Sequence, residues 1–282
     1  MLVNDVLIMI FEYLYDIDVS LFNCVLVSWD WANLAIPILW RDPFKYYDNN
    51  NNSLRKVVCH NLDVKDYFYK SDIPIKEYSV LLFPYLEYMK KVNTYHIEKV
   101  FKDSVYNIYT MIHAIIGFLF VTSEIINDIT IDCCFHNIED LNKYMKNHCV
   151  HLRLYNGCLE LNELENLDNL KSLSLTRISF EDNFIFLMKK LENMVNLELI
   201  NIHNKQLLYD IIKLQNIKFL TLNNSIHDVD KFILIMKEMK NLVYLKIISF
   251  DITDDDKKIL LNECKKYENI KTLKFEIKKY VL

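Results

Sequence analysis

The sequence contains very little glycine: Gly117 and Gly157 are the only two in 282 residues. Two isolated glycines build neither a GxGxxG segment nor a Walker-type loop, so Gly-rich phosphate-binding loops are excluded. Scarce glycine also means few sharp turns, which favours helices and repeats over β-sandwiches. The sequence also lacks a nucleophile elbow and an HExxH segment, and we expect this chain to supply no catalytic residue.

Positive charge is also scarce. The formal net charge is −5, and arginine occurs only at positions 41, 55, 153 and 177. Proteins that bind DNA or RNA usually carry a basic patch, and phosphate recognition often favours the guanidinium fork. We therefore expect no nucleic acid among the partners of this chain.

Apolar runs are too short to predict a membrane span. The longest runs from residue 108 to 121, and it is interrupted by Tyr109, Thr110, His113 and Gly117. A span needs about 18 apolar residues, so a buried helix is the favoured interpretation and a membrane segment the lesser one. Seven cysteines without a signal peptide indicate free thiols in a reducing, intracellular compartment, cytoplasmic or nuclear.

Two short Cys/His groups raise the question of a zinc site: Cys133, Cys134 and His136, and His148, Cys149 and His151. Their spacing matches neither CxxC nor HxxxH ligand pairs. Buried structural thiols are the favoured interpretation, and zinc remains the alternative. We expect no metal and no cofactor.

The first 43 residues predict three short helices. A first stripe recurs at intervals of three and four residues, formed by Val6, Leu7, Ile10, Phe11 and Leu14. Asp18 can cap a second helix, and Ser28 can cap a third that runs towards Pro37. Helices this short carry more apolar surface than they can bury among themselves. Another protein, or the rest of the chain, must cover the excess.

The order of these residues resembles the F-box. The matching pieces are Leu2-Val3, Val6-Leu7, Ile10-Phe11-Glu12-Tyr13-Leu14, the acidic turn Asp16 to Asp18, Val27-Ser28-Trp29-Asp30-Trp31 and Leu39-Trp40-Arg41. One departure is Val3, which stands where the family usually has proline. The resemblance implies that residues 1–43 bind a Skp-type adaptor, which links F-box proteins to a cullin-based ubiquitin ligase. The contacts it implies are Leu2, Val6, Leu7, Ile10, Phe11, Leu14, Leu21, Val27, Trp31, Leu39 and Trp40.

Residues 44–125 predict a helical adapter or linker region. The run Asn49 to Asn52 predicts a loop, and the apolar pattern that follows is helical but broken by Pro74 and Pro84. Residues 85–92 form one more short helix candidate in this region.

A repeat occupies residues 126–282. An aliphatic-x-x-aliphatic-x-aliphatic frame begins at Ile126, Cys149, Leu170, Met194, Ile217, Leu242 and Ile270, at intervals of 21 to 28 residues. Strand residues followed by a helix at such a period predict a solenoid of about seven irregular repeats, with a curved parallel sheet and outer helices. The sequence resembles the leucine-rich repeats that often follow an F-box, which makes the whole an α/β fold. Those repeats place Asn or Cys after the strand, whereas here only Cys134 fits, so we expect irregular turns.

Strand alternation predicts which residues face outward. With Leu173 and Leu175 inward, Ser172, Ser174 and Thr176 lie on the open, concave face, together with their equivalents in other repeats. The alternative for an aromatic residue on this face is that a loop or the C-terminal tail covers it. Exposed aromatics beside polar groups are typical of binding hot spots, so we predict target binding by Tyr155, Asn196, Phe219, Tyr244 and Lys246.

The sequence thus predicts a substrate-recognition subunit of an SCF-type ubiquitin ligase, with the F-box on the adaptor and the repeats on a protein target. A repeat scaffold without a ligase role is the first alternative. A small-ligand receptor is the second, and an unrecognised enzyme is less favoured than either. Thr253 and Asp256, three residues apart, also predict a capping box for a helix through Ile259 and Leu260.

Overall fold

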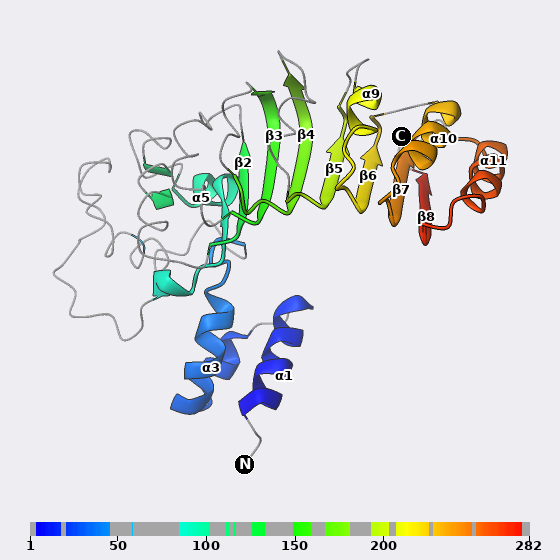
Figure 1. Ribbon diagram of the computed structural model, residues 1–282. Helices are drawn as coiled ribbons and strands as arrows, with labels where there is room; N and C mark the ends of the chain where they lie inside the picture. The colour runs from blue at the N-terminus through cyan, green and yellow to red at the C-terminus, as the bar shows by residue number, and fades with distance from the viewer. Residues whose placement is uncertain are drawn as a thin grey trace. The chain divides into compact units, whose positions relative to one another are not determined.

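The computed structural model describes residues 4–17, 21–45, 58, 85–101, 111–112, 115–116, 126–132, 149–159, 167–180, 193–202, 207–225, 228–249 and 252–277. The chain divides into two compact units, residues 1–129 and 130–282. In order along the chain, a helical N-terminal region is followed by an α/β region built on an eight-stranded sheet (Figure 1).

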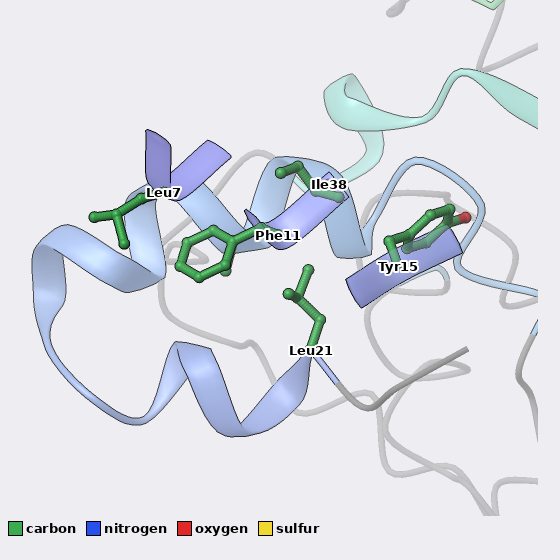
Figure 2. Packing of buried hydrophobic residues seen from close by; sticks show 6 residues of the cluster. Leu7, Phe11, Tyr15, Leu21 and Ile38 are labelled. Carbon is green, nitrogen blue, oxygen red and sulfur yellow. The ribbon is translucent and has the colours of Figure 1, made fainter. Parts of the chain in front are cut away.

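Three helices open the chain, as predicted: α1 (Asn4–Asp16), α2 (Phe22–Val25) and α3 (Trp29–Leu39). Their apolar residues meet in one core, formed by Leu7, Phe11, Tyr15, Leu21, Ala35 and Ile38. Phe11 is fully buried and points among the other side chains of this core (Figure 2). Its ring meets that of Trp31 edge-on, with 5.3 Å between centroids.

Of the two N-caps predicted for the first helices, the structure confirms the one at Ser28. Ser28 caps α3, since its Oγ accepts a hydrogen bond from the Trp31 N–H at 3.2 Å. Asp18 lies outside the described residues, and α2 begins later than predicted, with Leu21 in the N-cap position and no side-chain cap. Leu21 contributes to the apolar core instead, where it is 2% exposed.

The described part of residues 44–125 contains helices and also a strand, which the sequence did not predict. A 3-10 helix η2 (Tyr85–Tyr88) leads into strand β1 (Lys91–Asn93), and α5 (Thr94–Phe101) follows. Met89, Val92 and Thr94 are buried at the spacing of the repeat frame. The frame was missed here because 37 residues separate Met89 from Ile126 and because its last position is Thr.

Other expectations for this region fall mainly outside the described residues, including the Asn49 to Asn52 loop. Of the apolar run 108–121, the structure describes Met111, Ile112, Ile115 and Ile116, which are helical and buried. No helix in the described ranges is both long enough and apolar enough to cross a membrane.

The seven sequence frames all form strands. They are β2 (Asp128–Asp132), β3 (His151–Leu159), β4 (Ser172–Phe180), β5 (Asn196–Ile200), β6 (Phe219–Asn223), β7 (Tyr244–Ser249) and β8 (Thr272–Ile277). The eight strands lie in the sheet in sequence order, and every pair from β3 to β8 is parallel. This confirms the prediction of a parallel sheet built from the repeated frame.

Register aligns the frame residues across the sheet. Leu152, Leu173, Leu197, Leu220, Leu245 and Leu273 are partners in successive strands, as are Leu154, Leu175, Leu199, Leu222, Ile247 and Phe275. From β3 to β7 these side chains are at most 1% exposed. Each repeat therefore buries its aliphatic pair against the same pair of its neighbours, which is how such units stack.

Helices connect the later strands: α9 (Leu207–Ile211), α10 (Val229–Glu238) and α11 (Asp254–Cys264). Helix α10 packs beside both α9 and α11, and it buries Phe232, Ile235 and Met236. The predicted capping box of α11 is confirmed. The Thr253 Oγ1 accepts from the Asp256 N–H at 3.1 Å, and the Asp256 Oδ2 accepts from the Thr253 N–H at 2.9 Å.

One backbone feature recurs after the frame residues of four consecutive strands, β3 to β6, although β3 and β4 continue past it and β5 and β6 end there. Asn156, Arg177, Asn201 and Asn224 follow residues that pair in register, and all four adopt φ between 51° and 53°. Asparagine tolerates this left-handed region better than most residues. The Asn224 Nδ2 also donates to the Asn201 Oδ1 at 2.9 Å. Asn201 and Asn224, here called the strand-end asparagines, thus form a side-chain pair one position before the one where leucine-rich repeats place their Asn or Cys. The aligned position is Arg177 in β4 and Ser249 in β7.

The next position along the chain, where leucine-rich repeats place Asn or Cys, also joins neighbouring repeats through a side chain. Ser225 is buried there, and its Oγ accepts from the Ile202 N–H and donates to the Leu199 carbonyl, both at 3.1 Å. A serine hydroxyl can both donate and accept, so it joins two strands at a position where the sequence pattern has no Asn or Cys.

A further asparagine precedes the strands. Five consecutive repeats carry an asparagine one residue before the frame begins, at positions 169, 193, 216, 241 and 269. The Asn193 Nδ2 donates to the Asp168 carbonyl, the Asn241 Nδ2 to the Gln215 carbonyl, and the Asn269 Nδ2 to the Leu242 carbonyl, at 2.7 to 2.9 Å. Each bond joins a repeat to the preceding one. These strand-start asparagines were not recognised in the sequence.

Candidate protein-binding sites

The first helix is apolar on two sides. One side of α1 forms the buried core, whereas the other side, continued by the residue after the helix, exposes Val6, Met9, Ile10, Tyr13 and Ile17. These residues, here called the α1 stripe, recur at helical spacing, so they lie along one exposed side. A contiguous apolar stripe of this kind marks an interaction surface on a soluble protein.

A second exposed apolar group lies at α2 and the start of α3. Phe22, Leu26, Val27 and Trp29 are all more than half exposed. They surround the Ser28 cap, so the backbone that carries Val27 and Trp29 is fixed by a hydrogen bond. We call this group the α2–α3 corner.

The residues predicted to bind an adaptor fall into three sets. Val6, Ile10 and Val27 are exposed, at 41%, 42% and 61%. Leu14, Trp31, Leu39 and Trp40 are half-buried, and Leu7, Phe11 and Leu21 are buried in the core of the bundle. Leu2 lies outside the described residues. In this structure a partner can reach the first set directly, whereas the buried set shapes the surface from beneath.

A charged pocket of about 340 Å³ lies between α1, α3 and η2. Its lining includes Glu12 and Arg41, whose side chains form a short ion pair, together with Pro37 and Tyr88. The hydrogen bond that the Arg41 guanidinium donates to the Glu12 carboxylate raises the pKa of Arg41 above its ordinary value. This pocket combines an apolar wall with fixed charges, and it can accept one side chain of a bound protein.

A buried polar group follows α3. The Asp42 carboxyl is buried, and its Oδ1 has no hydrogen-bond partner in the described structure. Burial raises the pKa of Asp42, although the positive charges of nearby His96, Lys91 and Lys45 oppose that shift. Burial also lowers the pKa of His96. Both shifts favour the neutral form of each group.

The open face of the sheet carries an aromatic pair. Phe219 of β6 is 44% exposed, and its ring centroid lies 6.2 Å from that of Tyr244 in β7. Asn196 pairs with Phe219 in register, as the sequence predicted. Lys246, two residues after Tyr244, forms an ion pair of 2.7 Å with Glu276 of β8. That hydrogen bond raises the pKa of Lys246.

Tyr155 belongs elsewhere on this face. It lies in β3, three strands from β6, and it occupies the register position of Asn223 rather than that of Phe219. Strands in a sheet are about 4.8 Å apart and each residue advances about 3.3 Å along a strand, so three strands and four residues separate Tyr155 from Phe219 by roughly 20 Å. The structure thus brings together Asn196, Phe219, Tyr244 and Lys246, but it does not bring Tyr155 to them.

The outward-facing prediction needs two corrections. Ser174, Asn223 and Ile248 are predicted on the open face, yet each is buried. Ser174 is covered because its Oγ donates to the Glu198 Oε2 at 2.8 Å on the neighbouring strand. Residues of β8 were left out of the prediction, although Lys274 lies over the Tyr244 ring at 5.7 Å. The same alternation rule applied to β8 identifies Lys274 and Glu276.

Of the six residues considered for a zinc site, the structure describes only Cys149 and His151. Cys133, Cys134, His136 and His148 lie outside the described residues. Cys149 is buried, and its Sγ lies 3.6 Å from the His151 carbonyl oxygen. Among the residues that the structure covers, no group of three His, Cys, Asp or Glu side chains is placed to hold a metal ion.

One comparison with known proteins gives a match. Residues 4–46 match the F-box-like family. This segment contains α1, α2 and α3 in full, with the α1 stripe, the α2–α3 corner and Arg41. No curated protein matches the chain.

Proposed function

We propose that this chain is the substrate-recognition subunit of an SCF-type ubiquitin ligase. Its F-box-like region binds a Skp-type adaptor, and through it a cullin, and the open face of its repeats binds the protein to be ubiquitinated. The observation that carries the proposal is the coincidence of the F-box-like match with three helices that expose an apolar stripe.

The size of the exposed surface supports adaptor binding. Val6, Ile10 and Val27 are about half exposed. Complete burial of such a side chain contributes roughly 1.5–3 kcal/mol, so covering the exposed half of all three contributes about 3 kcal/mol. That corresponds to about a hundredfold in the dissociation constant. The remaining residues of the stripe and the corner add to this figure.

The repeat region suits a receptor better than an enzyme. Its seven repeats resemble leucine-rich repeats, and the aromatic pair Phe219 and Tyr244 lies among polar groups on the open face. We assign this face to the target. The chain itself supplies no catalytic residue: a lysine of the bound target is held near activated ubiquitin, which raises its effective concentration. Such a subunit works inside the cell, in the cytoplasm or the nucleus.

The first experiment measures binding of the full chain to a recombinant Skp-type adaptor by calorimetry. Ile10→Asp places a charge in the α1 stripe, and we expect it to weaken binding at least tenfold because the aspartate must lose its hydration in the interface. Ile259→Asp is the matched control, since Ile259 of α11 is exposed to a similar extent, at 48%, and lies outside the F-box-like segment. It should bind as the wild type does.

Failure of the wild-type chain to bind the adaptor would refute the proposal. Equal loss in both variants would show that the effect of Ile10→Asp is unspecific. In the first case the scaffold without a ligase role would become the better function, and in the second the α1 stripe would lose its assignment as the adaptor-binding surface. The observation that favours this alternative is Val3, which replaces the usual proline of the F-box pattern.

A further inference from the structure

The last strand of the sheet has an edge that no described strand covers. Within the described ranges, no strand pairs with the side of β8 that faces away from β7. Its frame residues Leu273 and Phe275 are only partly buried, whereas their partners Leu245 and Ile247 in β7 are at most 1% exposed. An edge of this kind offers unpaired N–H and C=O groups and apolar side chains to another strand. Figure 1 shows β8 and α11 as the last elements of the chain.

The sequence of β8 is complementary to itself. It reads Leu273-Lys274-Phe275-Glu276-Ile277, so opposite charges and apolar residues are arranged symmetrically about Phe275. When two antiparallel strands pair, residues directly opposite each other point to the same side of the sheet. A two-fold axis at Phe275 therefore places Lys274 of each copy opposite Glu276 of the other, with the apolar residues on the core side.

Other antiparallel registers are unfavourable. A shift by one residue places charged side chains opposite apolar ones. An axis at Lys274 places two lysines opposite each other, and an axis at Glu276 does the same with two glutamates. Like charges directly opposite each other destabilise a strand pair. Among these registers, only the one centred on Phe275 combines both charge pairs with a continuous apolar side.

We infer that β8 pairs with β8 of a second copy of this chain, forming a symmetric dimer in which the sheet continues from one copy into the other. A two-fold axis is the commonest symmetry of protein dimers, and it requires a self-complementary surface, which β8 has. The pairing is compatible with contacts inside each copy. Glu276 already pairs with Lys246, and a carboxylate can accept several hydrogen bonds, so Glu276 binds both lysines.

The dimer presents two open faces and two F-box-like segments in one particle. A target with two matching sites gains affinity from such bivalency without any new contact. The inference does not depend on the proposed function, because it rests only on the sequence, the register and the exposure of β8.

Analytical ultracentrifugation of the full chain tests the inference. We expect concentration-dependent dimerisation of the wild type, with its dissociation constant in the micromolar range or below. Lys274→Glu makes both charge pairs of the dimer acidic, and Glu276→Lys makes both of them basic. Each variant should raise the dissociation constant at least tenfold. Lys218→Glu makes the same charge change as the first variant at an exposed residue outside β8 and should leave the dimer unchanged.

Mixing the two variants gives the decisive result. The two acidic side chains in β8 of the Lys274→Glu variant then lie opposite the two basic side chains in β8 of the Glu276→Lys variant. Each variant alone therefore dimerises more weakly than the wild type, whereas the mixture forms a heterodimer about as tightly as the wild type forms its dimer. No contact within one copy can produce this recovery. Circular dichroism spectra matching that of the wild type will show that both variants fold. A wild type that is monomeric at about 100 μM, well above the expected dissociation constant, or a mixture that stays monomeric, would overturn the inference.

Discussion

Replacing Asn224 tests whether the strand-end asparagines hold the repeats together. Asn224 has φ of 51°, and its Nδ2 donates to the Asn201 Oδ1 at 2.9 Å. Two substitutions separate these two properties. Asn224→Gly removes the hydrogen bond but tolerates the left-handed backbone, whereas Asn224→Ala removes the hydrogen bond and also disfavours that backbone.

The two substitutions differ in their expected free energies of unfolding. Loss of the hydrogen bond costs about 1 kcal/mol, and alanine in the left-handed region costs roughly 1–2 kcal/mol more. We therefore expect Asn224→Ala to lose about 2–3 kcal/mol. Asn224→Gly should lose about 1–2 kcal/mol, because glycine also raises the entropy of the unfolded chain. The predicted order of stability is wild type, then glycine, then alanine.

Asn262 provides the matched control. It is exposed in helix α11, where alanine is favoured over glycine by about 1 kcal/mol. The order of the two variants must therefore reverse between positions 224 and 262. Urea unfolding followed by far-ultraviolet circular dichroism measures all four variants. An Asn224→Ala variant that is as stable as Asn224→Gly would refute the role assigned to the left-handed turn.

The other predictions concern the sheet core and the buried acid. Leu220→Ala in β6 should lose about 3 kcal/mol or more in urea unfolding, since the side chain is fully buried between Leu197 and Leu245. Leu273→Ala in β8 should lose about half as much because its side chain is only partly buried, and equal losses would contradict the uncovered edge. Asp42→Asn should raise the melting temperature at pH 7, because burial raises the pKa of Asp42 and the fold favours the protonated carboxyl. Above that raised pKa the ionised carboxyl weakens the fold by a constant amount, and this cost disappears as pH falls from the raised pKa to the ordinary value of the unfolded chain. The gain should therefore be constant above the raised pKa and shrink across that window; a gain that does not change there would refute the assignment.

The repeats were predictable because their core obeys a simple rule. Each strand must turn two apolar residues inward, with one outward-facing residue between them. Leu173 and Leu175 of β4 show this spacing, and Leu197 and Leu199 repeat it in β5. Strand β1 escaped prediction since its frame ends in Thr94 and is separated by a longer interval from the next. Sequence periodicity detects frames at a constant interval, whereas a strand at a different interval can still pair with the edge of the sheet, as β1 does.

The turn chemistry was harder to predict. The leucine-rich-repeat pattern predicts a ladder from the side chain at one position, namely that of Ser225 and its equivalents. The structure uses the preceding position, where a backbone in the left-handed region favours asparagine, as at Asn201 and Asn224, although Arg177 adopts the same φ. A sequence pattern reports which residue recurs, but it does not report the backbone angle that makes it recur.

In the F-box-like segment, the buried and exposed sides of α1 could not be distinguished from the sequence. Adjacent apolar pairs such as Val6-Leu7 and Ile10-Phe11 occupy both sides of α1, so hydrophobic periodicity predicts the helix but cannot separate its buried side from its exposed side. The structure separates them: Leu7 and Phe11 are buried, whereas Val6 and Ile10 are exposed. For the same reason, family resemblance named all four as contacts without dividing them.

The distribution of exposed apolar residues argues that the first helices are built to be covered. Among the described residues, nine of the fourteen large apolar side chains that are exposed lie between Val6 and Trp29. Isolated apolar residues are normal on any protein surface, but such a concentration within one short segment is not. The helices already have a packed core around Phe11, so the exposed residues are not needed to fold the bundle. A protein partner that covers the α1 stripe and the α2–α3 corner explains why these residues are apolar.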